Sequence, residues 1–405
     1  MRFVNRWRDP EIPDTFYILM LGRFVNLVGN SLVFPFMTIY LATRLHASMT
    51  VVGLIMTLYG LSQVAAQLIG GVLSDTWGRR RVMVLSLSLG PAFTICVGLA
   101  RSPMLLIAAL VFMGLTVPLF QPASMAMVGD LVPSSKLTQA YSLMRMASNA
   151  GIIIGPMIGG FLADRSFVAI FGLDALSMLL YLALILRSIP DLHTTAAPDP
   201  SGVRPRGLLD VARDRSFVRF SLLWSLTGMV YAQLYQVVPA YLHLDLHDPA
   251  STFGYLAAEN AFLVLVLQWP ITRLARRRAP AQLMAIGTLF YGLGFLVLLL
   301  GRSVLLFAFG VFIITIGENV INPAASTWVA GRAPEELRGR YMGLFGLANR
   351  TGSALGPTVG GSLLSIGAAY WLAVVSSGAG AVSWGFWRFS RKEAEERSVA
   401  VPVAR

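Results

Sequence analysis

Residues 151–160 read GIIIGPMIGG and residues 352–361 read GSALGPTVGG, with Gly, Gly-Pro and Gly-Gly at the same spacing. The two stretches are offset by 201 residues in a chain of 405. The same offset, applied without a gap, superposes Tyr40-Leu41 on Tyr241-Leu242 and Pro122-Ala123 on Pro323-Ala324. One constant offset over so many Gly and Pro positions predicts two copies of one structural unit.

The composition excludes a soluble enzyme. Hydrophobic residues make up 56% of the chain and charged residues 13%, with a mean hydropathy of +0.67, whereas soluble proteins carry about 25% charged residues. A single cysteine, Cys96, excludes an internal disulfide framework and a cysteine-based zinc site, and the four His are too scattered for a metal cluster. No G-x-x-x-x-G-K-S/T phosphate loop occurs. We therefore expect no enzymatic activity, no cofactor and no metal.

Apolar stretches of about 20 residues recur along the chain, and each is long enough to cross a bilayer core as a helix. Twelve are expected, at 16–43, 50–73, 82–100, 104–129, 140–163, 168–187, 216–242, 252–273, 282–300, 304–330, 340–364 and 370–389. Six spans per copy is an even number, so both copies enter the membrane in the same orientation, as in parallel-repeat transporters. The expected fold is an all-α membrane protein of twelve transmembrane helices in two parallel six-helix repeats. The expected domains are bundles at 1–190 and 216–405, the second with a short cytoplasmic tail, joined by a cytoplasmic linker at 191–215.

The net charge of +12 is concentrated in particular loops. About 24 of the 32 Lys and Arg residues lie in the N-terminal segment and the even-numbered loops, as in Arg79-Arg80-Arg81 and Arg276-Arg277-Arg278. The odd-numbered loops hold Arg44, Arg101, Arg165 and Arg302. By the positive-inside rule, both termini are expected in the cytoplasm of a protein of the inner membrane. The basic charge is therefore a topology signal, and no nucleic-acid partner is expected.

The strongest local motif is GVLSDTWGRRR at residues 71–81, directly after the second span. Gly78 permits a tight turn. Asp75 opposes the dipole of the helix that it ends, so its carboxylate needs another partner. Asp130, at the cytoplasmic end of the fourth span, is an expected acceptor for Arg79 or Arg80.

This run resembles the signature between helices 2 and 3 of the major facilitator superfamily. In that family the Asp and Arg residues of the signature latch the cytoplasmic side shut in the outward-open state. The second copy departs from the pattern, because Arg276 stands opposite Asp75 and Ala279-Pro280 stands opposite Gly78-Arg79. A one-sided latch in the N-terminal half is therefore expected. Its residues are Gly71, Asp75, Gly78, Arg79, Arg80 and Asp130.

The second motif lies in the fifth span, where glycine recurs every four residues at 151, 155 and 159 and forms a groove for close helix contact. Pro156 removes a backbone donor and can kink the helix. Ordinary small-residue packing is one interpretation. The whole motif, with Gly151, Gly155, Pro156, Gly159 and Gly160, is also similar to the one that marks the drug/proton antiporter branch of the family, where it lines the contact between halves. That resemblance favours multidrug efflux, and thus antibiotic resistance, over uptake.

Ionisable residues inside a membrane are usually functional because burying them is costly. Glu318 lies in the middle of the tenth span, shares a helix face with Asn322, and has Asn319 beside it. Such a carboxyl is expected to exchange protons and to attract cationic substrate groups, and its segment resembles that of proton-coupled multidrug exporters. The alternative is a Glu held by an Arg for structure. Glu259, next to Asn260, is the second candidate for proton coupling, with a structural hydrogen bond as its alternative.

Arg23, Asn26 and Asn30 form one polar stripe on the first span, where Arg23 either snorkels to the cytoplasmic end or faces the cavity as a counter-ion. Asp174 is expected to cap its helix or to reach the membrane interface. Further polar candidates are Gln121 in the fourth span, Gln233, Tyr235 and Gln236 in the seventh, and Arg350 in the eleventh. The seventh span lacks the acid that some exporters of the family place there. Proton coupling is therefore expected to rest on Glu318 and Glu259 alone.

Together these features predict a monomeric, proton-coupled secondary transporter that exports small amphipathic or cationic compounds by alternating access. Its expected partners are a small-molecule substrate, protons and the lipid bilayer. Two alternatives stay open: a proton-coupled uptake symporter for a nutrient such as a sugar or peptide, and a non-transporting sensor or scaffold with the same fold.

Overall fold

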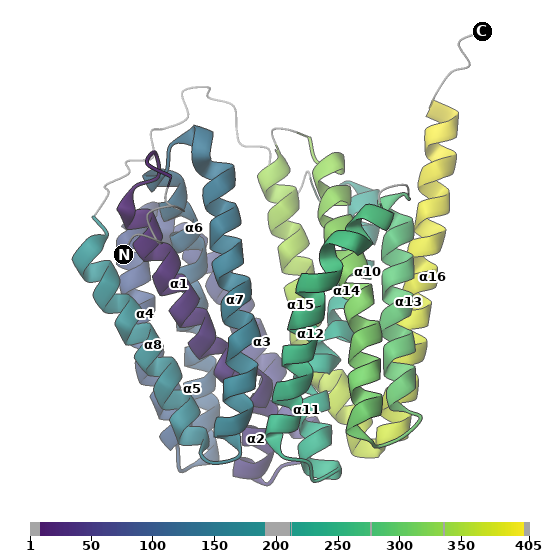
Figure 1. The fold of residues 1–405 in the computed structure, drawn as a ribbon, viewed down its shortest axis with the longest axis horizontal. Helices are drawn as coiled ribbons and strands as arrows, with labels where there is room; N and C mark the ends of the chain where they lie inside the picture. Colours follow the sequence, from purple (N-terminus) through teal and green to yellow (C-terminus); the bar gives the residue numbers. More distant parts are fainter. Residues whose placement is uncertain (1–8, 191–210, 212, 276–277, 335–336, 401–405) are drawn as a thin grey trace. The chain divides into compact units, whose positions relative to one another are not determined.

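The computed structural model describes residues 9–190, 211, 213–275, 278–334 and 337–400, and within these ranges the chain is all-α, with no strand (Figure 1). The predicted linker at 191–215 and the predicted mismatch at Arg276 fall largely outside these residues. Each of the twelve predicted spans coincides with a helical segment of the structure. The predicted all-α fold of twelve transmembrane helices is thus confirmed.

The first repeat contains six segments that are long and apolar enough to cross a membrane. They are α1 (Asp14–Val33) continuing into α2 (Met37–Leu45), α3 (Met49–Trp77), α4 (Arg79–Leu99), α5 (Pro103–Thr116) continuing into α6 (Phe120–Leu131), α7 (Leu137–Ala163) and α8 (Phe167–Ser188).

The second repeat follows the same order. Its helices are α10 (Arg215–Gln236) with the short α11 (Val238–Ala240), α12 (Ala250–Ala275), α13 (Pro280–Leu298), α14 (Val304–Arg332), α15 (Arg338–Ile366) and α16 (Ala368–Ala400). Of these, α12, α13 and α14 are also apolar enough to span by composition alone. The other long helices are more polar because α10 begins with Arg215 and Arg219, α15 carries Arg350, and α16 ends in a charged stretch.

The chain divides into two compact units that follow the repeats except for two short exchanged segments. Among the described residues, the first unit contains 9–40, 58–190 and 249–255, and the second contains 41–57, 211–248 and 256–400. The first turns of α3 therefore belong to the second unit, and the first turns of α12 belong to the first unit. Asp164, just after α7, binds those first turns of α12, since its carboxylate accepts hydrogen bonds from the backbone N–H groups of Ala250 (2.6 Å) and Ser251 (3.2 Å).

The glycine motifs lie where helices approach most closely. In the first unit a Cβ added to Gly151 would meet Leu27 of α1, and one added to Gly159 would meet the carbonyl of Leu32. In the second unit, Gly352 is pressed in the same way against the backbone of Ser225 in α10. The four-residue glycine spacing therefore packs the fifth helix of each repeat on the first.

The last glycine of each motif faces the exchanged segment instead. Gly160 abuts Ser251 and Gly254 at the start of α12, and the equivalent Gly361 abuts Met49 and Gly53 at the start of α3. A second layer of contacts in the second unit joins Thr57 of α3 to the Ala354 carbonyl of α15 (2.7 Å). In both repeats, therefore, the last glycine of the motif packs against the start of an exchanged segment.

Candidate functional site

A hydrogen-bonded polar cluster joins α10, α12 and α14 inside the second unit. The hydroxyl of Tyr235 donates to Asn260 Oδ1 (2.8 Å). Asn260 Nδ2 in turn donates to Thr315 Oγ1 (2.8 Å) and to Glu318 Oε2 (3.1 Å). Asn260 is therefore the hub that ties the carboxylate on α14 to the tyrosine on α10.

The helix periodicity of α10 and α14 explains why these groups meet. Thr315, Glu318 and Asn319 are spaced by three and four residues and share one face of α14, and Tyr231 and Tyr235 are four apart on α10. The side chain of Tyr231 also lies close to the Glu318 carboxylate. The polar stripe of each helix is thus turned toward that of the other.

Within the part of the chain that the structure describes, the Glu318 carboxylate has a hydrogen bond from Asn260 but no counter-charge. Its side chain is partly accessible, whereas Asn260 and Thr315 are buried. Among the described residues, no Lys, Arg or His lies within ion-pair distance of it. The alternative in which an Arg holds Glu318 for structure is not what the described residues show.

Asn319 and Asn322, the neighbours of Glu318 in sequence, differ in their surroundings. Asn319 is 1% exposed, donates to the Thr315 carbonyl (3.1 Å) and has no hydrogen-bond partner for its own Oδ1 among the described residues. Asn322 is exposed. Glu259 is half-buried beside Asn260 and forms no hydrogen bond or ion pair with any residue that the structure describes.

The two glutamines of α10 connect α10 to α15. Gln233 is 1% exposed; its Nε2 donates to the Gly356 carbonyl (3.0 Å) and its Oε1 accepts from Trp371 Nε1 (3.0 Å). Gln236 Nε2 reaches the Ser353 carbonyl (3.4 Å). Both the nitrogen and the oxygen of the Gln233 amide are thus hydrogen-bonded within the protein, which leaves neither for a substrate.

The polar stripe of α1 lies in the first unit. Arg23 and Asn26 are each 8% exposed, and Asn30 is half-buried. Arg23 Nε donates to Ser148 Oγ of α7 (3.3 Å), and no carboxylate among the described residues pairs with it. A guanidinium buried this deeply does not snorkel to solvent. Gln121 of α6 receives a long hydrogen bond from Gln67 of α3 (3.5 Å).

One ion pair predicted for the signature at 71–81 is present in the structure. Arg79 Nε lies 2.6 Å from Asp130 Oδ2, and both side chains are more than four-fifths buried. Gly78 adopts φ +97°, a conformation that favours glycine, and so lets the chain turn from α3 into α4. Arg80 instead donates to the Leu186 carbonyl (3.2 Å). Asp75 is exposed and forms no ion pair with a described residue.

Two residues differ from, or were missing in, the predictions from the sequence. The prediction for Asp174 is wrong: it lies within α8, is 2% exposed, and leaves its Oδ1 without a hydrogen-bond partner among the described residues, while Ser166 caps the helix. The second is Asp214, which sequence reasoning did not single out. Arg350, the polar candidate of the eleventh span, is exposed.

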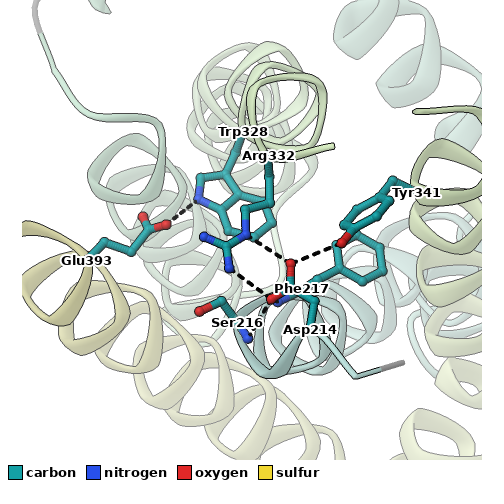
Figure 2. Close-up of polar contacts among 7 residues, drawn as sticks. All are labelled: Asp214, Ser216, Phe217, Trp328, Arg332, Tyr341 and Glu393. Atoms are coloured by element: carbon teal, nitrogen blue, oxygen red, sulfur yellow. Dashed lines mark hydrogen bonds and ion pairs between the residues drawn. The ribbon is translucent and has the colours of Figure 1, made fainter. Parts of the chain in front are cut away.

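Asp214 collects hydrogen bonds from three helices of the second unit (Figure 2). Its carboxylate accepts two from Arg332 of α14 (2.9 Å each) and one from the Tyr341 hydroxyl of α15 (3.1 Å). It also caps α10 by accepting from the backbone N–H groups of Ser216 and Phe217 (3.1 Å each). An Asp just before a predicted helix is a cap signal, but the partners from α14 and α15 are remote in sequence.

Comparisons with known proteins agree with this architecture. The family model described as Major Facilitator Superfamily matches residues 19–282 and 244–404. The chain is 30% identical to the Multidrug resistance protein MdtH of Yersinia enterocolitica over 355 residues, which is 87% of each protein. It is 29% identical to the protein of the same name from Cronobacter sakazakii over 386 residues, 93% of this chain and 94% of that one. A crystal structure of a POT family transporter in complex with 5-aminolevulinic acid shares the fold, with a TM-score of 0.79 and 18% identity over 94% of this chain and 96% of that one.

Proposed function

Because the chain belongs to the Major Facilitator Superfamily, we propose that it exports small amphipathic or cationic compounds in exchange for protons by alternating access. The proposal places it in the inner membrane with both termini in the cytoplasm, as the distribution of Lys and Arg favours. The similarity to multidrug resistance proteins and the glycine motif of α7 support export over uptake.

The observation that carries the proposal is the state of Glu318. A carboxylate within a membrane-spanning helix is stabilised by a counter-charge, by hydrogen bonds or by a proton. Among the described residues, the cluster supplies a hydrogen bond from Asn260, with Tyr231 close by, and no cation. The missing positive charge then comes from either a proton or a cationic substrate, and the two compete for the same carboxylate.

Competition of this kind is sufficient for exchange. A ligand drives a conformational change only through its different affinities for the two states. Here a proton taken up from outside weakens the hold of Glu318 on a cation, and proton release inside restores it. The partly exposed rings of Tyr231 and Tyr235, whose centroids are 5.8 Å apart, give an amphipathic cation an aromatic surface next to the carboxylate.

The test uses purified protein in liposomes, a permanently charged aromatic cation as substrate, and a membrane potential clamped with potassium and valinomycin. A permanent charge avoids passive trapping of a weak base in an acidic lumen. An acidic lumen drives the cation inward if the protein is an antiporter, and an acidic exterior drives it inward if the protein is a symporter. The sign of the effective gradient therefore separates export from the uptake alternative.

Glu318→Gln keeps the shape of the side chain and removes the charge, so we expect it to abolish proton-driven accumulation. Glu11→Gln, at an exposed carboxyl outside the predicted spans, is the matched control and keeps it. If Glu318→Gln accumulates the cation with an unchanged pH dependence, the assignment of Glu318 is wrong. If Glu259→Gln loses coupling instead, Glu259 is the proton carrier.

A further inference from the structure

A groove of about 770 Å³ lies between α10 and α16 in the second unit. Four basic side chains line it, namely Arg219 of α10 and Arg388, Arg391 and Lys392 of α16, together with one acid, Glu395. The groove therefore has a net formal charge of about +3, counting each ionised side chain as one unit. None of these residues belongs to the polar cluster around Glu318.

The groove changes from apolar to basic along one face of α16. Arg388 lies four residues after Trp384, and Arg391 and Lys392 lie three and four residues after Arg388, so all four share that face. At a rise of 1.5 Å per residue, Lys392 lies eight residues and about 12 Å beyond Trp384 along the helix. The predicted twelfth span ends at residue 389, within this stretch, and the polar layer on each side of a bilayer core is roughly 5–8 Å thick. We therefore expect this face to pass from the acyl region into the headgroup region.

The second wall of the groove repeats this order. On α10, Arg219 lies in the second turn and Leu222 lies three residues further into the span. Leu222 is 63% exposed and Trp384 is 61% exposed, so the apolar part of the groove is uncovered by the protein. Both walls thus present an open apolar surface that continues directly into a cluster of cations.

Two contacts fix the walls in place. The guanidinium carbon of Arg388 lies 4.7 Å from the ring centroid of Trp384, a cation–π contact that holds both at the mouth of the groove. Behind them, a Cβ added to Gly385 would come within 2.7 Å of the Leu223 side chain, so α16 lies close to α10 at this point. The binding surface is therefore built before a ligand arrives.

We propose that this groove binds an anionic phospholipid. Its phosphate would lie among Arg219, Arg388 and Arg391, and one acyl chain would lie along Leu222 and Trp384. The cations complement the charge of the phosphate. The open apolar wall favours a lipid over a free phosphate, because a free phosphate has no acyl chain to cover that wall.

Native mass spectrometry of the detergent-solubilised protein tests the proposal with phosphatidylglycerol and phosphatidylcholine of identical acyl chains. Each basic residue near an anionic headgroup contributes a factor of about five in affinity. We expect Arg388→Gln to weaken phosphatidylglycerol binding about fivefold and the triple change at Arg219, Arg388 and Arg391 to weaken it on the order of a hundredfold. Thermal unfolding checks that each variant is folded.

Arg273→Gln is the matched control, because Arg273 lies over Trp269 (5.5 Å) in the same four-residue arrangement but outside the groove. It leaves phosphatidylglycerol binding unchanged. Equal retention of both lipids, an equal loss in Arg273→Gln, or competition by glycerol phosphate at the lipid concentration would each overturn the proposal. If the triple variant unfolds, Leu222→Glu is the second test, because it blocks the apolar wall and keeps the four cations. We expect it to weaken phosphatidylglycerol binding by at least about tenfold. Unchanged binding in this variant would also overturn the proposal.

Discussion

Two substitutions of Asp214 separate the contribution of its ion pair with Arg332 to stability from that of its helix cap (Figure 2). Asp214→Asn keeps an oxygen that caps α10 and removes the charge that pairs with Arg332, whereas Asp214→Ala removes both. The Asp214 side chain is 15% exposed and that of Arg332 is 41% exposed. Solvent therefore screens the pair in part, and its contribution lies near the upper end of exposed pairs, at about 1 kcal/mol.

A helix cap contributes about 1 kcal/mol. We therefore expect the free energy of unfolding to fall by about 1 kcal/mol in Asp214→Asn and by about 2 kcal/mol in Asp214→Ala. Titration of unfolding by SDS in mixed micelles measures both values. A double-mutant cycle with Arg332→Gln is expected to give a coupling energy of about 1 kcal/mol with Asp214→Asn. Equal losses in the two Asp214 variants, or strictly additive effects with Arg332→Gln, would refute this reasoning.

The same pair predicts a pH dependence with a definite sign. Burial opposes the ionised form of Asp214, but the hydrogen bonds from Arg332 and from the backbone of Phe217 outweigh it, so the pKa of Asp214 lies below its usual value. A lowered pKa stabilises the folded state above the unfolded pKa, and that stability is lost as the pH falls through the folded pKa. The advantage of the parent protein over Asp214→Asn should stay constant from pH 8 to about 5 and shrink below about 4.

Two further changes test helix packing. Gly352→Ala puts a methyl group against the backbone of Ser225, so we expect the free energy of unfolding in the same SDS titration to fall by about 1–3 kcal/mol. In the control Gly343→Ala, in the same helix, the added methyl group meets no described atom within 4 Å and should not destabilise the protein. Equal effects of the two changes would contradict this expectation. Gln233→Ala leaves the indole N–H of Trp371 without its acceptor, which costs about 1–3 kcal/mol, while transport per folded molecule stays at the parent level. A stable Gln233→Ala protein with altered substrate affinity would instead assign Gln233 to the substrate site.

Features that repeat in the sequence were predictable from it. The twelve spans followed from hydropathy because a bilayer leaves an apolar chain no alternative to the helix. Glycine at every fourth position of α7 predicted a surface for close helix contact, but α1 as its partner was not predictable from that spacing. The pairing of Arg79 with Asp130 followed from charge at the two helix ends that the loop signature brings together.

Which neighbouring helix a given side chain contacts was not predictable from the sequence. Gln233 and Tyr235 are two residues apart on α10, yet one packs against α15 and the other donates to Asn260. Asp174 looked like an interfacial residue because hydropathy places it near a helix end, whereas packing against α1 buries it beside Gly29. In each case the helix period was known, and its rotation about its own axis was not.

The exchange of segments between the repeats affects how the protein is made. The first unit includes residues 249–255, which follow the first repeat by some 60 residues. At a synthesis rate of about 5–20 residues per second, the ribosome needs roughly 3–12 seconds to produce them after α8. During that interval α7 is already in place but Asp164 still lacks the start of α12. A nascent chain halted between the repeats therefore presents an unfinished bundle to the insertion machinery, and two halves produced from separate messages must find each other before either can close.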